Sequence, residues 1–222
     1  SRSGRRTDVV GCAKVVGRMA VLRAPRAAEE IMLLKKTYHQ NWEQLTAALR
    51  HTIGLPGWDL CVLTARDKAQ AMAFEAEIAT RRENRMLLTD TRFGVMADPE
   101  GQRVGSGGAT LRALENLASE LEDGVQLLSS QSEPARHVLI IHPGGEPKFS
   151  RTAPSEDSLF RVLPYRLPNG LPATRFDETL ASLSALPERL SEGAMIVSGN
   201  SLLLFSVPEL SLTNAGVTAI AM

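Results

Sequence analysis

The chain of 222 residues has few cysteines, few aromatic residues and no net charge. Its two cysteines, Cys12 and Cys61, are isolated and lack the spacing of metal ligands. Cys61 falls in an apolar run, which predicts a reduced core thiol and favours a cytoplasmic setting. No run of about 20 apolar residues occurs, so we expect no membrane span. Since the formal charge is zero, nothing favours nucleic-acid binding across the whole surface.

Charge is nevertheless unevenly distributed along the chain. Residues 1–36 contain nine Lys or Arg and three acidic residues, and they lack the continuous apolar region of a secretory signal. We interpret 1–36 as a basic leader, expected to be poorly ordered or to reflect where the chain was cut. A nucleic-acid or organelle-targeting role is the alternative. Residues 37–222 are then predicted to form one α/β domain, which we expect to be incomplete. The chain of 222 residues is long enough to bury roughly 70% of its unfolded surface.

Apolar periodicity predicts strands that alternate with helices. The helical pattern covers residues 27–50, 67–85, a segment ending near 121, and 176–190; the strand pattern covers 58–65, 92–97, 137–142, 194–198, 202–205 and 217–221. This alternation is typical of an α/β fold with a mostly parallel sheet covered on both faces. Ligands of such sheets bind where the carboxyl ends of the strands lead into loops.

A glycine cluster follows the second predicted strand and leads directly into a helix. It consists of Gly105, Ser106, Gly107 and Gly108, and Arg103 precedes it as a cation. Glycines permit φ > 0 and close approach of the backbone to a ligand, while the amino end of a helix favours an anion. The segment therefore predicts phosphate binding; a glycine-rich turn that merely caps a helix is the alternative.

A second glycine pair follows the strand predicted at 137–142. Gly144 and Gly145 come directly after that strand, and Lys148 follows them. Neither glycine segment has the spacing of a Walker motif or of a dinucleotide-binding fingerprint. His142, at the end of the strand, either lines a pocket or is a structural histidine. Asp177, at the start of a predicted helix, is interpreted first as an amino-terminal charge that stabilises the helix dipole.

From Trp58 onward, about 165 residues resemble the fucose-1-phosphate guanylyltransferase (GDP-fucose pyrophosphorylase) family. This family includes the pyrophosphorylase half of bifunctional L-fucokinase/GDP-fucose pyrophosphorylases. The segments that carry the resemblance are collinear: 58–65, 98–101, 103–114, 138–145, 159–160, 163–164, 172–178, 196–199 and 202–205. It implies a glycosyltransferase-A-like, Rossmann-like nucleotidyltransferase domain, truncated at the carboxyl terminus, whose further modules are missing.

The resemblance also implies a reaction and a site. GTP and a sugar 1-phosphate would be the substrates, with GMP transferred to L-fucose 1-phosphate. Lys148 and Arg103 would be the catalytic cations. The nucleotide-binding residues would be Gly105, Ser106, Gly107, Gly108, Gly144 and Gly145. Asn200 would stand at the position of a ligand to Mg²⁺.

Three residues depart from the family pattern. Phe149 and Ser158 replace an arginine and a lysine, and Asn200 replaces an aspartate. An amide can coordinate Mg²⁺ through its oxygen but brings no charge, whereas hard cations prefer carboxylates. The alternative function is therefore a catalytically impaired nucleotide-binding or assembly module of a larger protein of this kind.

Overall fold

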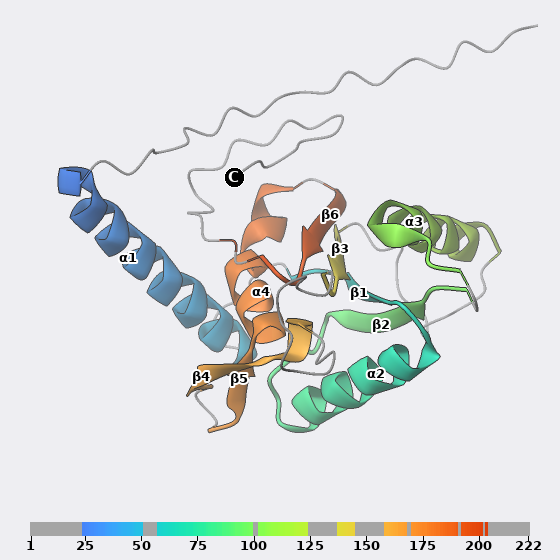
Figure 1. Cartoon of the computed structure of the whole chain (residues 1–222), viewed down its shortest axis with the longest axis horizontal. Helices are drawn as coiled ribbons and strands as arrows, with labels where there is room; N and C mark the ends of the chain where they lie inside the picture. Colours follow the sequence, from blue (N-terminus) through green and yellow to red (C-terminus); the bar gives the residue numbers. More distant parts are fainter. Residues whose placement is uncertain are drawn as a thin grey trace, which may run out of the picture.

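A parallel sheet of four strands forms the centre of the molecule in the computed structural model (Figure 1). The structure describes residues 24–50, 57–99, 102–123, 137–144, 158–167, 170–190, 192–201 and 203. The strand order is β2-β1-β3-β6, and all three neighbouring pairs are parallel. The strands are β1 (Leu60–Ala65), β2 (Arg92–Ala97), β3 (His137–His142) and β6 (Gly193–Ser198). These confirm four of the predicted strands.

The two central strands are apolar because both of their faces are covered. Every residue of β1 is buried, and so is every residue of β3 after His137. Strands buried on both sides read as continuous apolar runs, which is the pattern that predicted them. The edge strand β6 is more exposed, with Ile196 at 47%.

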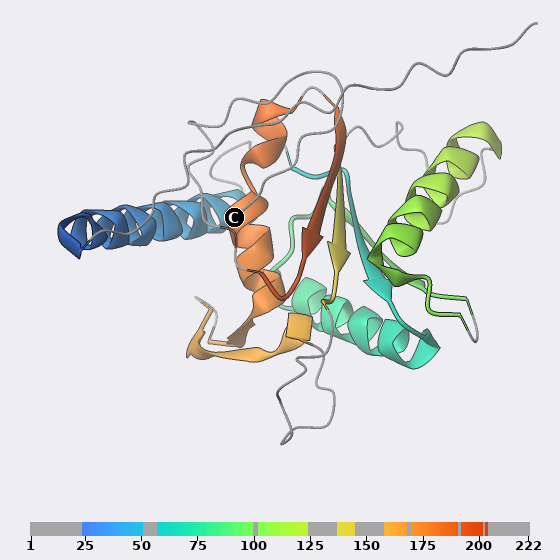
Figure 2. The same cartoon turned by 45° about the horizontal axis from the view of Figure 1, so that its top comes forward.

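Helices cover both faces of the sheet, as expected (Figure 2). α2 (Lys68–Glu83) and α4 (Arg175–Leu183) pack on one face, and α3 (Gly105–Asp123) packs on the other. α1 (Ala24–Leu49) packs against α4 and begins within the segment predicted as a basic leader. None of the described helices is long and apolar enough to cross a membrane.

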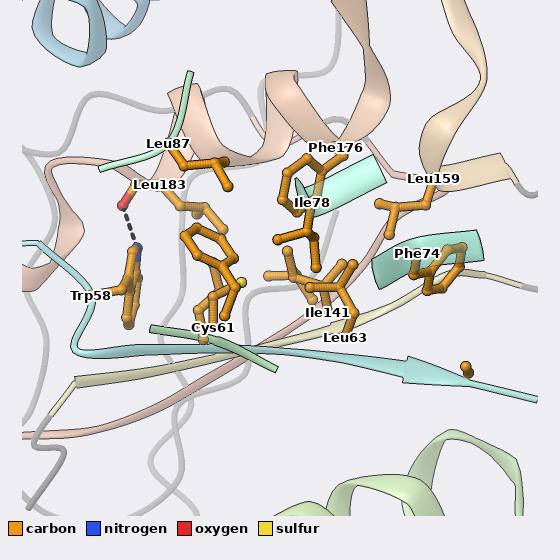
Figure 3. Close-up of a cluster of buried hydrophobic side chains, with 14 of the residues drawn as sticks. Trp58, Cys61, Leu63, Phe74, Ile78, Leu87, Ile141, Leu159, Phe176 and Leu183 are labelled. Atoms are coloured by element: carbon orange, nitrogen blue, oxygen red, sulfur yellow. Dashed lines mark hydrogen bonds between the residues drawn. The ribbon is translucent and has the colours of Figure 1, made fainter. Parts of the chain in front are cut away.

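The larger part of the core lies between the sheet and the α2–α4 layer (Figure 3). Phe74 of α2 and Phe176 of α4 are both fully buried against Leu63 and Ile141. Burial of each such side chain contributes about 1.5–3 kcal/mol. The indole N–H of Trp58 donates to the carbonyl of Leu183 at 3.0 Å, so the one polar atom of this tryptophan is satisfied.

A buried ion pair joins α2 to α4. The Arg81 guanidinium donates to both carboxylate oxygens of Asp177, while the backbone N–H of Thr174 donates to Asp177 Oδ2 at 2.8 Å. Asp177 therefore caps the start of α4, which confirms the structural interpretation of this residue. The pKa of Arg81 is raised: burial lowers it, but Asp177 and then Glu77 outweigh that effect.

Other elements differ from the sequence-based prediction. The helix predicted over 176–190 ends at Leu183 and is followed by a short 3₁₀ helix, η2 (Leu186–Arg189). Pro187 explains the break, because it has no N–H to donate to the carbonyl of Leu183, four residues earlier, and its ring clashes with that carbonyl. The two-stranded antiparallel sheet of β4 (Val162–Arg166) and β5 (Pro172–Thr174) was not predicted, nor was the 3₁₀ helix η1 (Ser158–Phe160). The strands predicted at 202–205 and 217–221 lie outside the described residues, apart from residue 203.

Candidate functional site

The topology places a switch point between β1 and β3 at the carboxyl ends of the strands. From β1 the chain passes through α2 to β2 on one side, and from β2 it passes through α3 to β3 on the other side of β1. The two connecting helices lie on opposite faces of the sheet (Figure 2). Such a switch point is where open α/β sheets bind ligands.

A cleft of about 550 Å³ opens where β1 and β2 end. Its volume is within the range of small-molecule sites. Three cationic side chains and two carboxylates contribute to its walls, together with small or neutral residues: Arg66, Asp67, Lys68, Ala69, Asp98, Pro99, Gln102 and Arg103. The two carboxylates do not fully offset the three positive charges, so the cleft favours an anionic ligand.

The first wall of the cleft is the start of α2. Asp67 is the N-cap, and its Oδ1 accepts the Gln70 backbone N–H at 2.8 Å. That hydrogen bond is the main reason why the pKa of Asp67 is lowered, with Arg66 adding to the effect. Arg66 Nε donates to Asp67 Oδ2 at 3.1 Å. Asp67 thus stays ionised and fixes the helix start that presents Lys68 and Ala69 to the cleft.

The opposite wall is the turn between β2 and α3. Asp98 N–H donates to the Ala65 carbonyl at 2.7 Å, and Asp98 Oδ2 accepts the Val104 N–H at 3.3 Å. The second bond fixes the backbone just before α3. Arg103 is exposed, and no residue in the described part of the chain forms an ion pair with it. Its guanidinium lines the cleft, where it can meet a ligand.

The glycine cluster forms the first turn of α3 rather than a loop before it. Gly105 has φ +70°, in the left-handed region, whereas Gly107 is helical, so the expectation of φ > 0 holds at Gly105 and is wrong at Gly107. A Cβ at Gly107 would meet no atom within 4 Å, and Ser106 is exposed as well. A Cβ at Gly108 would lie 2.8 Å from Val104 Cβ, so Gly108 is required by packing. The first turn leaves its amides without intrahelical partners and open to an anion.

The structure also brings together two residues that the sequence singled out separately, Gly144 and Asn200. Gly144 has φ +87°, and a Cβ there would lie 2.8 Å from Asn200 Cβ. Asn200 Oδ1 accepts the Ser198 hydroxyl at 2.6 Å, and its carbonyl accepts Arg175 Nη1 at 2.9 Å. The ends of β3 and β6 are therefore in contact. Gly145, Lys148 and Phe149 lie outside the described residues.

His142 connects the two glycine segments. Its Nδ1 is 2.8 Å from Thr64 Oγ1 at the end of β1, and its Nε2 is 2.8 Å from Thr110 Oγ1 in α3. The side chain is buried, and burial lowers its pKa although the charge of Asp98 acts in the opposite direction. The imidazole is therefore neutral near pH 7, with both nitrogens in hydrogen bonds. This geometry favours the structural role over a pocket-lining one.

Four residues of this site were missed by sequence analysis. Arg66 and Lys68 belong to no recognised motif, although their position directly after a predicted strand could have identified them as site residues. Thr64 and Thr110 gave no signal, because their role depends on a histidine that is far away in the sequence for each of them.

Three curated proteins are similar in sequence to this chain. A bifunctional fucokinase/GDP-fucose pyrophosphorylase of Arabidopsis thaliana is 29% identical over 196 residues, which is 81% of this chain and 19% of the relative. The fucose-1-phosphate guanylyltransferases of Mus musculus and Homo sapiens are 29% and 27% identical over 168 residues, 74% of this chain and 26% of each relative. The chain resembles fucose-1-phosphate guanylyltransferases.

The resemblance stated from the motifs is therefore confirmed, and the α/β architecture agrees with it. The chain spans about a fifth to a quarter of the length of these relatives. No family model matches the chain. No solved structure matches it.

Proposed function

We propose that this domain serves guanylyl transfer from GTP to L-fucose 1-phosphate in the protein that contains it. A phosphate oxygen of the sugar phosphate attacks the α-phosphorus of GTP, and the bond to the pyrophosphate oxygen breaks. GDP-fucose and pyrophosphate are the products. Similarity to proteins named fucose-1-phosphate guanylyltransferase supports this reaction.

The observation that carries the proposal is the cationic cleft beside the first turn of α3. Arg66, Lys68 and Arg103 line one cavity at the carboxyl edge of the sheet. Nucleotidyl transfer depends on positioning the phosphates and on cations that neutralise the charge developing on them. A triphosphate placed in this cleft would meet these cations, and the glycine turn of α3 begins two residues after Arg103.

Within this proposal, each predicted residue has a defined task. Arg103 and the amides of Gly105–Gly108 bind phosphate oxygens, and the absence of a side chain at Gly107 permits close approach. Lys148 stays a predicted catalytic cation, and Gly144 and Gly145 stay predicted nucleotide contacts. His142 needs no role as a base, because the attacking phosphate is already ionised.

A magnesium ion at Asn200 also stays a prediction. In the described part of the chain no group of three or more His, Cys, Asp or Glu side chains forms a metal site. Asn200 Oδ1 accepts hydroxyls of Ser198 and Ser201, at 2.6 and 3.4 Å. One neutral oxygen that already accepts these bonds is a poor fit for a hard dication, so no step of the proposed reaction is assigned to a metal there.

The deciding experiment incubates the protein with GTP, Mg²⁺ and β-L-fucose 1-phosphate and measures released pyrophosphate. Free L-fucose serves as the control acceptor, since it lacks the attacking phosphate. We expect pyrophosphate only with the sugar phosphate. GTP binding without pyrophosphate release would favour the nucleotide-binding or assembly module, and absence of GTP binding would contradict the assignment of the cleft.

A cytoplasmic setting is part of the proposal, supported by the free, fully buried thiol of Cys61.

A further inference from the structure

The first turns of α3 have low intrinsic helical stability, and few of their apolar side chains are packed against the sheet. Three of the first four residues of this helix are glycines, which are less favourable than alanine in a helix. The buried apolar side chains of its described part are the small ones of Ala109 and Ala113, while Leu111 is 62% exposed. Among the described side chains, apolar packing of α3 is therefore slight, and a polar anchor helps to fix the position of the glycine turn.

A chain of three side chains supplies that anchor. Thr64 of β1, His142 of β3 and Thr110 of α3 are joined by two hydrogen bonds of 2.8 Å. Thr64 is 4% exposed and His142 is 9% exposed. Thr110 lies one helical turn after Ser106 and Gly107, on the same side of α3. The chain thus connects the two central strands to the turn that carries the exposed amides.

The chemistry of the imidazole suits this arrangement. A neutral histidine has one ring N–H and one ring nitrogen that accepts, whereas a threonine hydroxyl can either donate or accept. Each hydroxyl can therefore complement the nitrogen that it faces. Both nitrogens are in use, so His142 has no free one with which to abstract a proton or bind a metal.

We infer that His142 is a positioning residue. Through Thr110 it holds the glycine turn of α3 at a fixed position relative to the cleft, and it thereby sets the affinity for the nucleotide. The inference rests on the proposed function, since nucleotide binding is its functional readout. The anchor itself is a structural statement that can be measured without any ligand.

Two substitutions of the histidine separate its two hydrogen bonds. His142→Gln places an amide group near the position of Nε2 and keeps the bond to Thr110, whereas His142→Asn places one near Nδ1 and keeps only the bond to Thr64. Thr110→Val removes the α3 hydroxyl with little change of shape. Thr91→Val is the matched control, because Thr91 is a buried threonine whose hydroxyl has no hydrogen-bond partner among the described residues.

The experiment measures GTP affinity by calorimetry and amide hydrogen exchange of residues 102–110 without ligand, after urea unfolding has shown that each variant is folded. We expect His142→Asn and Thr110→Val to weaken GTP binding about tenfold, the size of one buried hydrogen bond, and to speed exchange of the glycine turn. His142→Gln should stay within about threefold of the parent, and Thr91→Val should match it.

Several results would overturn the inference. Equal losses in the Gln and Asn variants would show that the bond to Thr110 is not the one that matters. Faster exchange without weaker GTP binding would leave His142 with a purely structural role, and weaker binding without faster exchange would show that the anchor is not the cause. If the parent protein binds no GTP, the proposed function fails, and unchanged exchange in Thr110→Val would overturn the anchor separately.

Discussion

Arg81 of α2 and Asp177 of α4 form a bidentate ion pair, with Nε to Oδ1 at 2.8 Å and Nη2 to Oδ2 at 3.1 Å. Their side chains are only 6% and 5% exposed. The guanidinium also lies over the ring of Phe160, 4.9 Å from its centroid. The pair thus fixes the two helices that cover one face of the sheet, and Asp177 belongs to the scaffold rather than to the reaction.

Asp177→Asn should lower the free energy of unfolding by about 3 kcal/mol, because it leaves a buried guanidinium without its main counter-charge. The matched control is Glu77→Gln, which removes the other partner of Arg81. Glu77 is 46% exposed, so this change should cost less than about 1 kcal/mol. Urea unfolding measures both, and equal losses would contradict the scaffold role of the pair.

Substitution by alanine should have opposite effects on the free energy of unfolding at two glycines of the same turn. Gly105→Ala should lower the free energy of unfolding by about 1–2 kcal/mol, because φ at this position is +70°. Gly107→Ala should be neutral or add up to about 1 kcal/mol, since the position is helical and open. The same methyl group should weaken GTP binding in calorimetry. Unchanged affinity of Gly107→Ala would argue that no phosphate approaches this turn.

Arg103→Ala should weaken GTP binding about tenfold, because an exposed guanidinium that lines the cleft can form charge-assisted bonds with phosphate. Arg82→Ala is the control. Arg82 is an exposed arginine near the far end of α2, about 20 Å along that helix from the cleft. The affinity should fall less at high salt in the Arg103 variant than in the parent. Identical affinities of the two variants would remove Arg103 from the site.

Stability should decrease with rising pH because of Glu178. Burial raises the pKa of this carboxyl from its ordinary value of 4.5, and the hydrogen bond from Tyr38 only partly opposes the shift. The folded state therefore holds a proton that the unfolded state has released, so this contribution to stability is complete below 4.5 and is lost as pH rises through the raised pKa. Urea unfolding of Glu178→Gln between pH 4 and 8 should show a flatter profile than the parent, and an unchanged slope would contradict this.

Asn200→Asp tests the predicted metal position. Arg175 donates to the backbone carbonyl of Asn200, and the Ser198 hydroxyl can donate to a carboxylate as it does to the amide, so the variant should fold. If Mg²⁺ binds here, the added charge should strengthen Mg²⁺ binding and raise pyrophosphate release. Mg²⁺ titration by calorimetry is the readout that does not depend on turnover. No change in either measurement would show that the end of β6 is not a metal site.

The buried strands could be predicted because burial on both faces leaves a continuous apolar run. The predicted strands at 92–97 and 137–142 have the bounds of β2 and β3, and the helix predicted from residue 67 begins at Lys68 with Asp67 as its N-cap. The strands β4 and β5 escaped prediction because they are short and rich in proline, and because β4 is mostly exposed. Their positions depend on pairing with each other rather than on a periodic pattern.

The site was predictable only where glycine or a strand end marked it. Gly105 and Gly144 both have the left-handed backbone conformation that only glycine adopts easily. By contrast, the contact between Thr110 and His142 joins residues that are 32 positions apart, and the presence of Lys68 and Arg103 in one cleft depends on the packing of two helices against one sheet. No local spacing encodes such contacts.

The position of β1 between β2 and β3 has a consequence for synthesis of the chain. Leu60 pairs with Arg92 on one side and with Val138 on the other, so the central strand is made first and its second partner emerges much later. At about 5–20 residues per second, β1 waits on the order of 2–9 seconds for β3 after β2 has appeared. During that interval one edge of an apolar strand is open to other nascent chains. Slower growth at low temperature should therefore increase the soluble yield by reducing the number of such chains present together.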